Sequence, residues 1–144
     1  MYAFLNTWRK SLKSVPQLRF YIQEPGCNGY DFHYHQTERP EFVLGRTANQ
    51  CGERVVRIQL QDPRVSRNHC RIFLHPRGYW MIEDLGSTNG TYIQLPDAEL
   101  DLWQQVQYAT PLPDEIDIRI GATLLAMRPL ESHTPARFAV KQAA

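Results

Sequence analysis

Alternating apolar and polar residues in several short segments are the sequence feature that most restricts how this chain can fold. In each segment every second residue is apolar, and the segments are 18–23, 30–35, 56–61, 70–74 and 116–120. A period of two turns one face of a strand toward a core and the other toward water. Turns rich in Pro, Gly and Asn separate the segments, and no long helical pattern interrupts them. The sequence therefore predicts an all-β sandwich rather than βαβ units.

The size and composition of the chain are those of one globular domain. With 144 residues, of which 42% are hydrophobic and 22% charged, the chain can bury a substantial core, and wholesale disorder is not expected. The formal net charge of +1 argues against nucleic acid as a partner, because proteins that bind a duplex usually carry a basic excess.

The cysteines and the apolar runs indicate a soluble protein of a reducing compartment. Cys27, Cys51 and Cys70 are odd in number and form no Cys-x-x-Cys pair, so they suggest neither a disulfide framework nor a zinc site. No apolar run approaches the roughly 20 residues that span a bilayer, and the first residues lack the continuous apolar segment of a signal peptide. We therefore expect a cytoplasmic protein without a membrane span.

A turn rich in hydroxyl and amide side chains, Asp84 to Thr91, directly follows an alternating run. Within this turn, Asn89-Gly90 is a strong signal for a tight reversal of the chain. Two loops with further hydrogen-bond donors precede it, one at Gly45-Arg46 and one from Ser66 to His69. Such donor-rich loops at strand ends indicate a site for a polar ligand.

These three segments, in this order and spacing, resemble the motifs of the forkhead-associated (FHA) domain, a phosphothreonine-peptide-binding module. Gly45-Arg46, Ser66-x-x-His69 and Asn89-Gly90-Thr91 match the family's pattern, and the resemblance covers about residues 18 to 130. It implies a two-sheet, SMAD-like β-sandwich of about 10–11 mostly antiparallel strands. It also implies a signalling adaptor, linked to Ser/Thr kinases, that binds phosphothreonine-containing proteins without catalysis or a cofactor and prefers phosphothreonine to phosphoserine.

The residues expected to bind the phosphopeptide are Arg46, Ser66, Arg67, Thr88 and Asn89. A phosphothreonine carries nearly two negative charges and three acceptor oxygens, and the guanidinium of Arg46 keeps its proton and presents a fork of donors to such a group. By resemblance, Ser66 and Thr88 donate hydroxyl hydrogens to the phosphate, and Arg67 assists at the phosphate or at the peptide backbone. Asn89 has both an amide donor and a carbonyl acceptor, so it can pair with the peptide main chain.

Other residues are expected to support or to tune the site. Gly45 allows the bend at a strand end, and Gly86 and Gly90 shape the facing turn. By resemblance, His69 braces the loops by hydrogen bonding and does not touch the phosphate. Arg64 matches a position at which the family can read a peptide side chain, and its charge predicts a preference for Asp or Glu there. A solvated surface arginine would look the same in the sequence.

The resemblance divides the chain into three parts. Residues 1–17 are expected to be an amphipathic extension with a short helix that packs on its own domain, docks to a partner or a membrane surface, or is a frayed terminus. Residues 18–130 form the sandwich domain, and residues 131–144 a flexible tail. Within the domain, residues 93–112 depart from the family, which often continues into a second Asn-Gly hairpin, and they read as a helical turn or a long polar loop.

Two other functions compete with the adaptor. A phospho-independent scaffold could use the same fold, because a fold does not guarantee a function. An enzyme is disfavoured, because the sequence shows no activated nucleophile, no complete ligand set and no phosphate-cradling loop before a helix. His33 and His35 share a strand face, but two histidines without a nearby carboxylate or thiolate do not complete a zinc site. We expect no metal.

Overall fold

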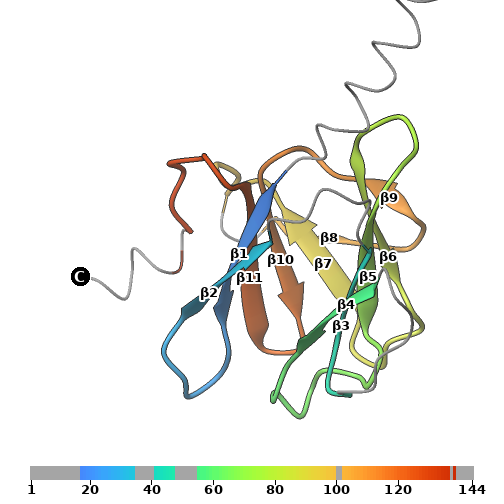
Figure 1. The fold of residues 1–144 in the computed structure, drawn as a ribbon. Helices are drawn as coiled ribbons and strands as arrows, with labels where there is room; N and C mark the ends of the chain where they lie inside the picture. The colour runs from blue at the N-terminus through green and yellow to red at the C-terminus, as the bar shows by residue number, and fades with distance from the viewer. Residues whose placement is uncertain (1–16, 35–40, 48–54, 100–101, 137, 139–144) are drawn as a thin grey trace, which may run out of the picture.

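A computed structural model of the chain describes residues 17–34, 41–47, 55–99, 102–136 and 138. The amphipathic helix expected within residues 1–17 lies outside these ranges except for Gln17, and so do His35 and Cys51. The described residues form eleven β-strands joined by turns and loops (Figure 1). The prediction of an all-β chain with about this many strands is confirmed.

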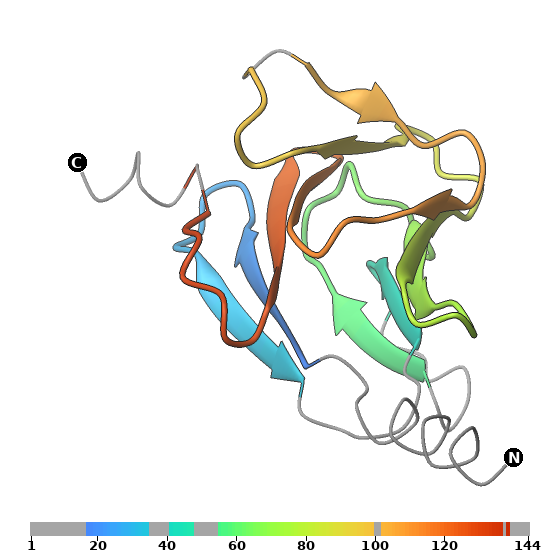
Figure 2. The same ribbon diagram turned by 90° about the horizontal axis from the view of Figure 1, so that it is seen from above.

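The strands form two sheets that pack face to face. Their bounds are β1 Leu18–Gln23, β2 Tyr30–Tyr34, β3 Glu41–Gly45, β4 Val55–Gln59, β5 Cys70–Leu74, β6 Trp80–Asp84, β7 Thr91–Gln94, β8 Gln104–Gln105, β9 Thr110–Pro111, β10 Ile116–Ile120 and β11 Thr123–Pro129. One sheet has the order β2-β1-β11-β10-β7-β8 and the other β4-β3-β5-β6-β9. Figure 2 shows β1 and β2, in blue, on one side of the molecule and the green strands β4 to β6 on the other. The β3–β4 pair is parallel and the other described pairs are antiparallel.

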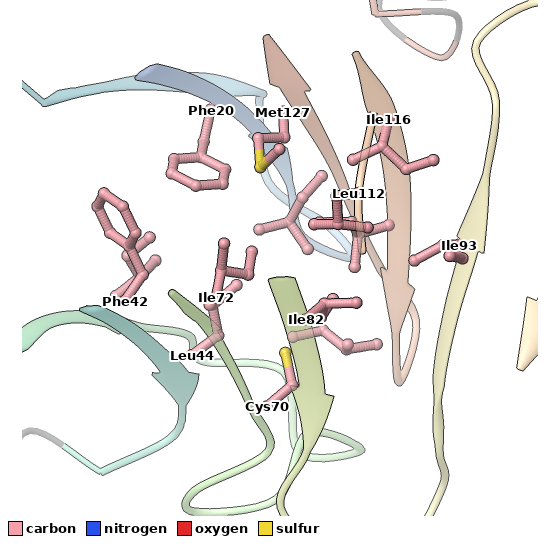
Figure 3. Close-up of a cluster of buried hydrophobic side chains, with 14 of the residues drawn as sticks. Phe20, Phe42, Leu44, Cys70, Ile72, Ile82, Ile93, Leu112, Ile116 and Met127 are labelled. Carbon is pink, nitrogen blue, oxygen red and sulfur yellow. The ribbon is translucent and has the colours of Figure 1, made fainter. Parts of the chain in front are cut away.

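The core between the sheets is built by the alternating residues that the sequence pattern singles out. In β1, Leu18, Phe20 and Ile22 are at most 2% exposed, whereas the residues between them are half-buried on the outer face. The same alternation buries Ile116, Ile118 and Ile120 of β10 in the same sheet. These residues form one apolar cluster with residues of the other sheet such as Phe42 and Ile72 (Figure 3). Burial of this cluster is the main force that holds the sandwich together.

Phe42 of β3 is the centre of an aromatic group within this core. Its ring lies 5.2 Å from that of Phe20 and 5.0 Å from that of Tyr34, both in edge-to-face geometry, and 5.9 Å from the larger ring of Trp80. Edge-to-face pairs stabilise a core beyond the area that they bury. Because β3 ends at the loop that carries Arg46, this aromatic group fixes one side of the site described below.

Residues 93–112 contain two short strands rather than a helical turn. β7 pairs with β8 in an antiparallel hairpin, with Tyr92 opposite Gln105. The chain then crosses to the other sheet, where β9 pairs with β6. Gln94 holds the long connection, since its amide Nε2 donates to the carbonyls of Glu99 and Leu102 at 2.6 and 3.2 Å. The hairpin therefore forms without the Asn-Gly turn that the family often has there.

The segment that follows β11 is fastened to the sandwich at least as far as Ala136, which differs from the expectation of a flexible tail over residues 131–144. Arg128, which is fully buried, donates to the carbonyls of Thr134 and Pro135, and Arg19 donates to that of Ser132. The hydroxyls of Ser132 and Thr134 also donate to the carboxylate of Glu115, so arginines of the sheet and side chains of the segment both hold it. Residues 137 and 139–144 lie outside the described part of the chain.

Candidate functional site

The loops that follow β3 and precede β5 and β7 meet at one end of the sandwich, at the bottom of Figure 1. We call this end the loop rim, and define it as residues 45–47, 61–69 and 84–91. The rim brings together all the residues that the sequence assigns to phosphopeptide binding, from three separate parts of the chain. The hydrogen bonds described next hold the three loops in fixed positions relative to one another.

Gly45 allows the first loop to lie directly against the second. A Cβ atom built on Gly45 would overlap the carbonyl group of Arg67, so no other residue fits without moving one loop. Two backbone hydrogen bonds join the loops beside this contact, from Arg46 N to the Ser66 carbonyl at 3.1 Å and from Thr47 N to the Arg67 carbonyl at 3.2 Å. The requirement for glycine here is close approach between backbones rather than only a bend.

Arg46 is exposed, and its guanidinium is aimed by one hydrogen bond. Its Nε donates to the backbone carbonyl of Val65, whereas no partner is recorded for its two terminal nitrogens among the described residues. The salt bridges of the described residues involve Arg71 and Arg128, so Arg46 has no carboxylate partner in that part of the chain. The charge and the two terminal nitrogens are therefore available to an anion.

Ser66 and Thr88 lie on facing loops and are joined through their polar groups. The hydroxyl oxygen of Ser66 accepts a hydrogen bond from the backbone N–H of Thr88 at 3.1 Å. Because the oxygen is the acceptor in this bond, the hydroxyl hydrogen of Ser66 remains available to donate elsewhere. Thr88 is exposed, and its own hydroxyl has no recorded partner among the described residues.

His69 is fully buried beneath these loops and links two of them. Its Nδ1 accepts a hydrogen bond from the backbone N–H of Ser66 at 3.0 Å, and its Nε2 lies 2.8 Å from the carbonyl oxygen of Gly90. Since Nδ1 is an acceptor, the hydrogen of the neutral ring is on Nε2 and is donated to Gly90. Burial lowers the pKa of His69 below its ordinary value and keeps the ring neutral. With both nitrogens occupied, the ring has none left for catalysis.

Asp84 organises the turn that carries Thr88 and Asn89. Its carboxylate accepts hydrogen bonds from the backbone N–H groups of Gly86 and Ser87 and from the hydroxyls of Ser87 and Thr91. Partial burial acts to raise the pKa of Asp84, but these hydrogen bonds outweigh it and the pKa is lowered. Gly86 and Gly90 have φ values of 76° and 85°, a left-handed conformation that side chains with a Cβ rarely adopt.

Asn89 and Arg64 are held to one another across the rim. The amide Nδ2 of Asn89 donates to the backbone carbonyl of Arg64 at 2.8 Å. The second amide hydrogen and the carbonyl oxygen of Asn89 have no recorded partner among the described residues, so both remain for a peptide main chain. The side chains of Arg64 and Arg67 are exposed, and no carboxylate of the described residues pairs with them.

Two buried carboxylates beneath the rim were not found from the sequence. Glu24 is 6% exposed and Asp62 is 3% exposed. Glu24 Oε1 accepts from the backbone N–H groups of Gln61 and Asp62 at 2.6 and 3.1 Å, and Asp62 Oδ1 accepts from that of Arg64 at 2.9 Å. The signals present were an acidic residue directly before each of two prolines, which indicates a turn but not a buried acceptor.

The remaining features noted in the sequence are the histidines, the cysteines and the apolar runs. His33 is exposed on β2, and among the described residues no group of three or more metal-ligating side chains comes together. Cys27 is an exposed free thiol and Cys70 a buried one. In the part of the chain that the structure describes, no helix has the length and apolar character needed to span a bilayer.

The fold and the rim together define a class of protein, a β-sandwich module that presents polar loops at one end. The chain belongs to the FHA domain family, whose model matches residues 42–121. FHA domains are phosphopeptide-binding modules without catalytic activity. The resemblance drawn from the three loop motifs is thus confirmed.

Curated relatives of the chain include two FHA domain-containing proteins named FhaB. The protein from Mycolicibacterium smegmatis is 41% identical over 73 residues, which are 50% of this chain and 41% of the relative. The protein from Mycobacterium tuberculosis (strain H37Rv) shows the same identity and coverage. The match therefore spans less than half the length of these relatives.

Solved structures confirm the fold. The FHA domain of CT664 from Chlamydia trachomatis has a TM-score of 0.58 and 20% identity, with 78% of this chain and 96% of that chain covered. EmbR of Mycobacterium tuberculosis, in complex with a low-affinity phosphopeptide, has a TM-score of 0.56 and 20% identity, with 91% and 30% covered.

Proposed function

We propose that the loop rim binds phosphothreonine-containing segments of partner proteins, and that the chain acts as a non-catalytic adaptor in signalling by Ser/Thr kinases. Arg46 supplies the charge, Ser66 and Thr88 donate hydroxyl hydrogens to the phosphate, and Asn89 pairs with the peptide backbone. Arg67 assists from the same loop as Ser66. EmbR, which shares the fold over 30% of its chain, was solved in complex with a phosphopeptide, which supports the proposal.

The observation that carries the proposal is the set of donors left unused on loops that are tied to one another by hydrogen bonds. The terminal nitrogens of Arg46 and the hydroxyl hydrogens of Ser66 and Thr88 point to no acceptor that the structure records, although the loops around them are tied by backbone and side-chain bonds. A phosphate dianion offers three acceptor oxygens and the opposite charge.

The test is calorimetry with phosphothreonine peptides selected from an oriented library. Arg46→Ala is expected to weaken binding by about 2–5 kcal/mol, the scale for truncating one partner of a close charge pair. Arg77→Ala is the matched control, because Arg77 is an equally exposed arginine in the β5–β6 turn at the opposite end of the sandwich (Figure 1). Equal binding by the parent and Arg46→Ala, or equal binding of phosphorylated and unphosphorylated peptides, would reject the proposal. The second result would favour a phospho-independent scaffold.

Arg64 is proposed to read an acidic peptide side chain beside the phosphothreonine. Its guanidinium is exposed on the rim and has no carboxylate partner among the described residues. In the same peptide library, the parent is expected to select Asp or Glu at one position after the phosphothreonine, and Arg64→Ala to lose that selection while still requiring the phosphate. A parent profile without acidic enrichment would remove Arg64 from the site.

A further inference from the structure

The backbone of Arg64 is fixed by side chains on both sides. Its N–H is held at 2.9 Å by Asp62 Oδ1, and its carbonyl accepts from Asn89 Nδ2 at 2.8 Å. The first of these side chains lies under the rim, and the second lies on the facing loop. The position of Asn89 is therefore connected, through the peptide groups of Arg64, to the buried carboxylate of Asp62.

Asp62 is anchored to the other sheet of the sandwich. Its Oδ2 accepts from the backbone N–H of Ala122 at 2.8 Å and from the hydroxyl of Thr123 at 2.9 Å, both at the β10–β11 turn. Burial acts to raise the pKa of Asp62, but the hydrogen bonds from Arg64, Ala122 and Thr123 lower it below its ordinary value. The carboxylate therefore stays charged and remains an acceptor on both oxygens.

A second carboxylate holds Asp62 itself. Glu24, in the β1–β2 turn, accepts from the N–H of Asp62 and also from that of Gln61. No salt bridge of the described residues includes Glu24 or Asp62, so both are satisfied by uncharged donors. Buried carboxylates without a cation are costly unless they are hydrogen-bonded. Here that requirement holds three separate stretches of backbone together: the β1–β2 turn, residues 61–64 and the β10–β11 turn.

The contact between this loop and the opposite sheet leaves almost no free space. A Cβ atom built on Gly121 would lie 3.0 Å from the Cβ and the carbonyl carbon of Arg64 and 3.0 Å from Asp62 Oδ2. The loop thus rests directly on the β10–β11 turn, and a small shift of Asp62 would be transmitted to Arg64 rather than absorbed in a gap.

From this chain of contacts we infer that Asp62, supported by Glu24, is a positioning residue for phosphopeptide binding: it sets the place of Arg64 and, through the Arg64 carbonyl, the orientation of Asn89. The inference deepens the proposed function and rests on it. Asp62 does not touch the ligand, so its effect on binding passes through Asn89 and Arg64.

The test compares two buried aspartates. Asp62→Ala removes the acceptor under the rim, and Asp117→Ala is the matched control, because Asp117 is 2% exposed and lies at the far end of β10. Two quantities are measured for each variant: the affinity for a phosphothreonine peptide selected from an oriented library, and the NMR signals of the Asn89 side-chain amide together with the hydrogen exchange of the Arg64 N–H.

Both variants are expected to be less stable than the parent, but only Asp62→Ala should weaken peptide binding, by on the order of tenfold, with loss of the hydrogen-bonded signal of the Asn89 amide. Parental affinity in folded Asp62→Ala would overturn the inference, and so would an equal loss in Asp117→Ala. If Asp62→Ala does not fold, Asp62→Asn replaces it. In that variant, faster exchange of the Arg64 N–H without a loss of affinity would be the contradicting result.

Failure of the proposed function would be recognisable separately. If the parent showed no preference for phosphorylated over unphosphorylated peptides, the phosphothreonine assignment would be wrong. The Asn89 amide signal and the Arg64 exchange rate would still show, without any ligand, whether Asp62 positions these residues.

Discussion

Buried carboxylates hold the sandwich at both ends, but they are satisfied in different ways. At the loop rim, Glu24 and Asp62 accept hydrogen bonds from backbone N–H groups and hydroxyls. At the other end, Asp117 forms a salt bridge of 2.8 Å with Arg128, and both side chains are at most 3% exposed. The carboxylates at the rim accept hydrogen bonds from uncharged groups, whereas Asp117 is paired with the guanidinium of Arg128.

This difference determines which arginines remain available to a ligand. The guanidinium of Arg128 donates to Asp117 and to backbone carbonyls, and its bond to the carbonyl of Pro135 helps to hold the segment after β11. On the rim, the carboxylates take up peptide groups, and Arg46, Arg64 and Arg67 have no carboxylate partner among the described residues. A loop that must attract an anion is better stabilised by its own amides than by salt bridges, because each salt bridge would neutralise a charge that the ligand needs.

The largest loss of stability is expected when the salt bridge between Asp117 and Arg128 is removed. Arg128→Ala leaves the Asp117 carboxylate buried without its cation and should lower the free energy of unfolding by about 3–5 kcal/mol. Peptide affinity should stay at the parental value in the folded fraction, since Arg128 lies away from the rim. Urea unfolding and calorimetry measure the two quantities.

Arg128→Lys is the informative companion to that variant. It keeps the charge but cannot reproduce the guanidinium's bonds to Asp117 and the carbonyls, so an intermediate loss is expected. A full loss of peptide affinity in either variant would show that the two ends are coupled and that the comparison is wrong.

A smaller effect, mainly on affinity, is expected at the rim from Ser66→Ala, which also removes the exposed hydrogen bond from the Thr88 N–H. The variant removes a neutral donor to a charged acceptor, a hydrogen bond worth about 1.5–3 kcal/mol, and should weaken phosphopeptide binding accordingly. Ser132→Ala, which removes a hydroxyl bonded to Glu115 away from the rim, is the control. Calorimetry that found the two serine variants equally impaired would remove Ser66 from the site.

A further, smaller loss of stability is expected on acidification, and it should arise at the rim from the protonation of His69. Burial lowers the pKa of His69 below its ordinary 6.5, so the unfolded chain binds a proton at a pH at which the folded chain does not. The stability that neutral His69 contributes is therefore complete above pH 6.5 and is lost as the pH falls below it, at up to about 1.4 kcal/mol per pH unit.

Urea unfolding from about pH 7 to about pH 5 measures this slope, and His69→Gln, which cannot titrate, should flatten it. Asp62 and Asp84 have lowered pKa values as well, and their contribution should be lost only at lower pH, as it falls below the ordinary aspartate value of 3.8. A slope in His69→Gln as steep as that of the parent would assign the titration to another group.

The smallest loss of stability is expected for the partly exposed ion pairs of Arg71, which serve as a reference for the buried carboxylates at the two ends. Arg71 bridges Glu41 and Glu83 at 3.1 and 3.0 Å across the outer face of β3, β5 and β6, with side chains about a third exposed. Arg71→Ala should cost only about 0.2–1 kcal/mol, because water screens such pairs. If thermal unfolding showed that Arg71→Ala loses as much stability as Arg128→Ala, burial would not be what makes the Asp117–Arg128 salt bridge more important than the exposed pairs.

The sequence predicted the sandwich and the rim better than it predicted their supports. Strand alternation is a local property, and it correctly placed Phe20 of β1 and the isoleucines of β10 in the core. The motif residues of the rim are also brought together as the resemblance implied. Their detailed roles in binding stay predictions.

The buried residues that support the rim and the other end, Asp62 and Arg128, were not identified from the sequence, because a residue's burial and its tertiary partners are not visible in its local pattern. Asp62 acts on Ala122 and Thr123, about sixty residues away, and its own neighbourhood reads as an ordinary turn. Arg128 occupies an outward position on β11, where a charged residue would be expected in water, and becomes buried only because the segment after β11 folds over it. The two-residue strands β8 and β9 are too short to show any period.

The central place of β11 has a consequence for how the protein is made. β11 lies between β1 and β10, so the first and last strands of the described chain are hydrogen-bonded neighbours. A nascent chain on the ribosome cannot complete this sheet until Pro129 has emerged, and until then β1 lacks one of its two hydrogen-bonded neighbours. Such a high contact order predicts slow folding and dependence on chaperones during synthesis. The rim, which rests on the β10–β11 turn, would be among the last parts to become competent for binding.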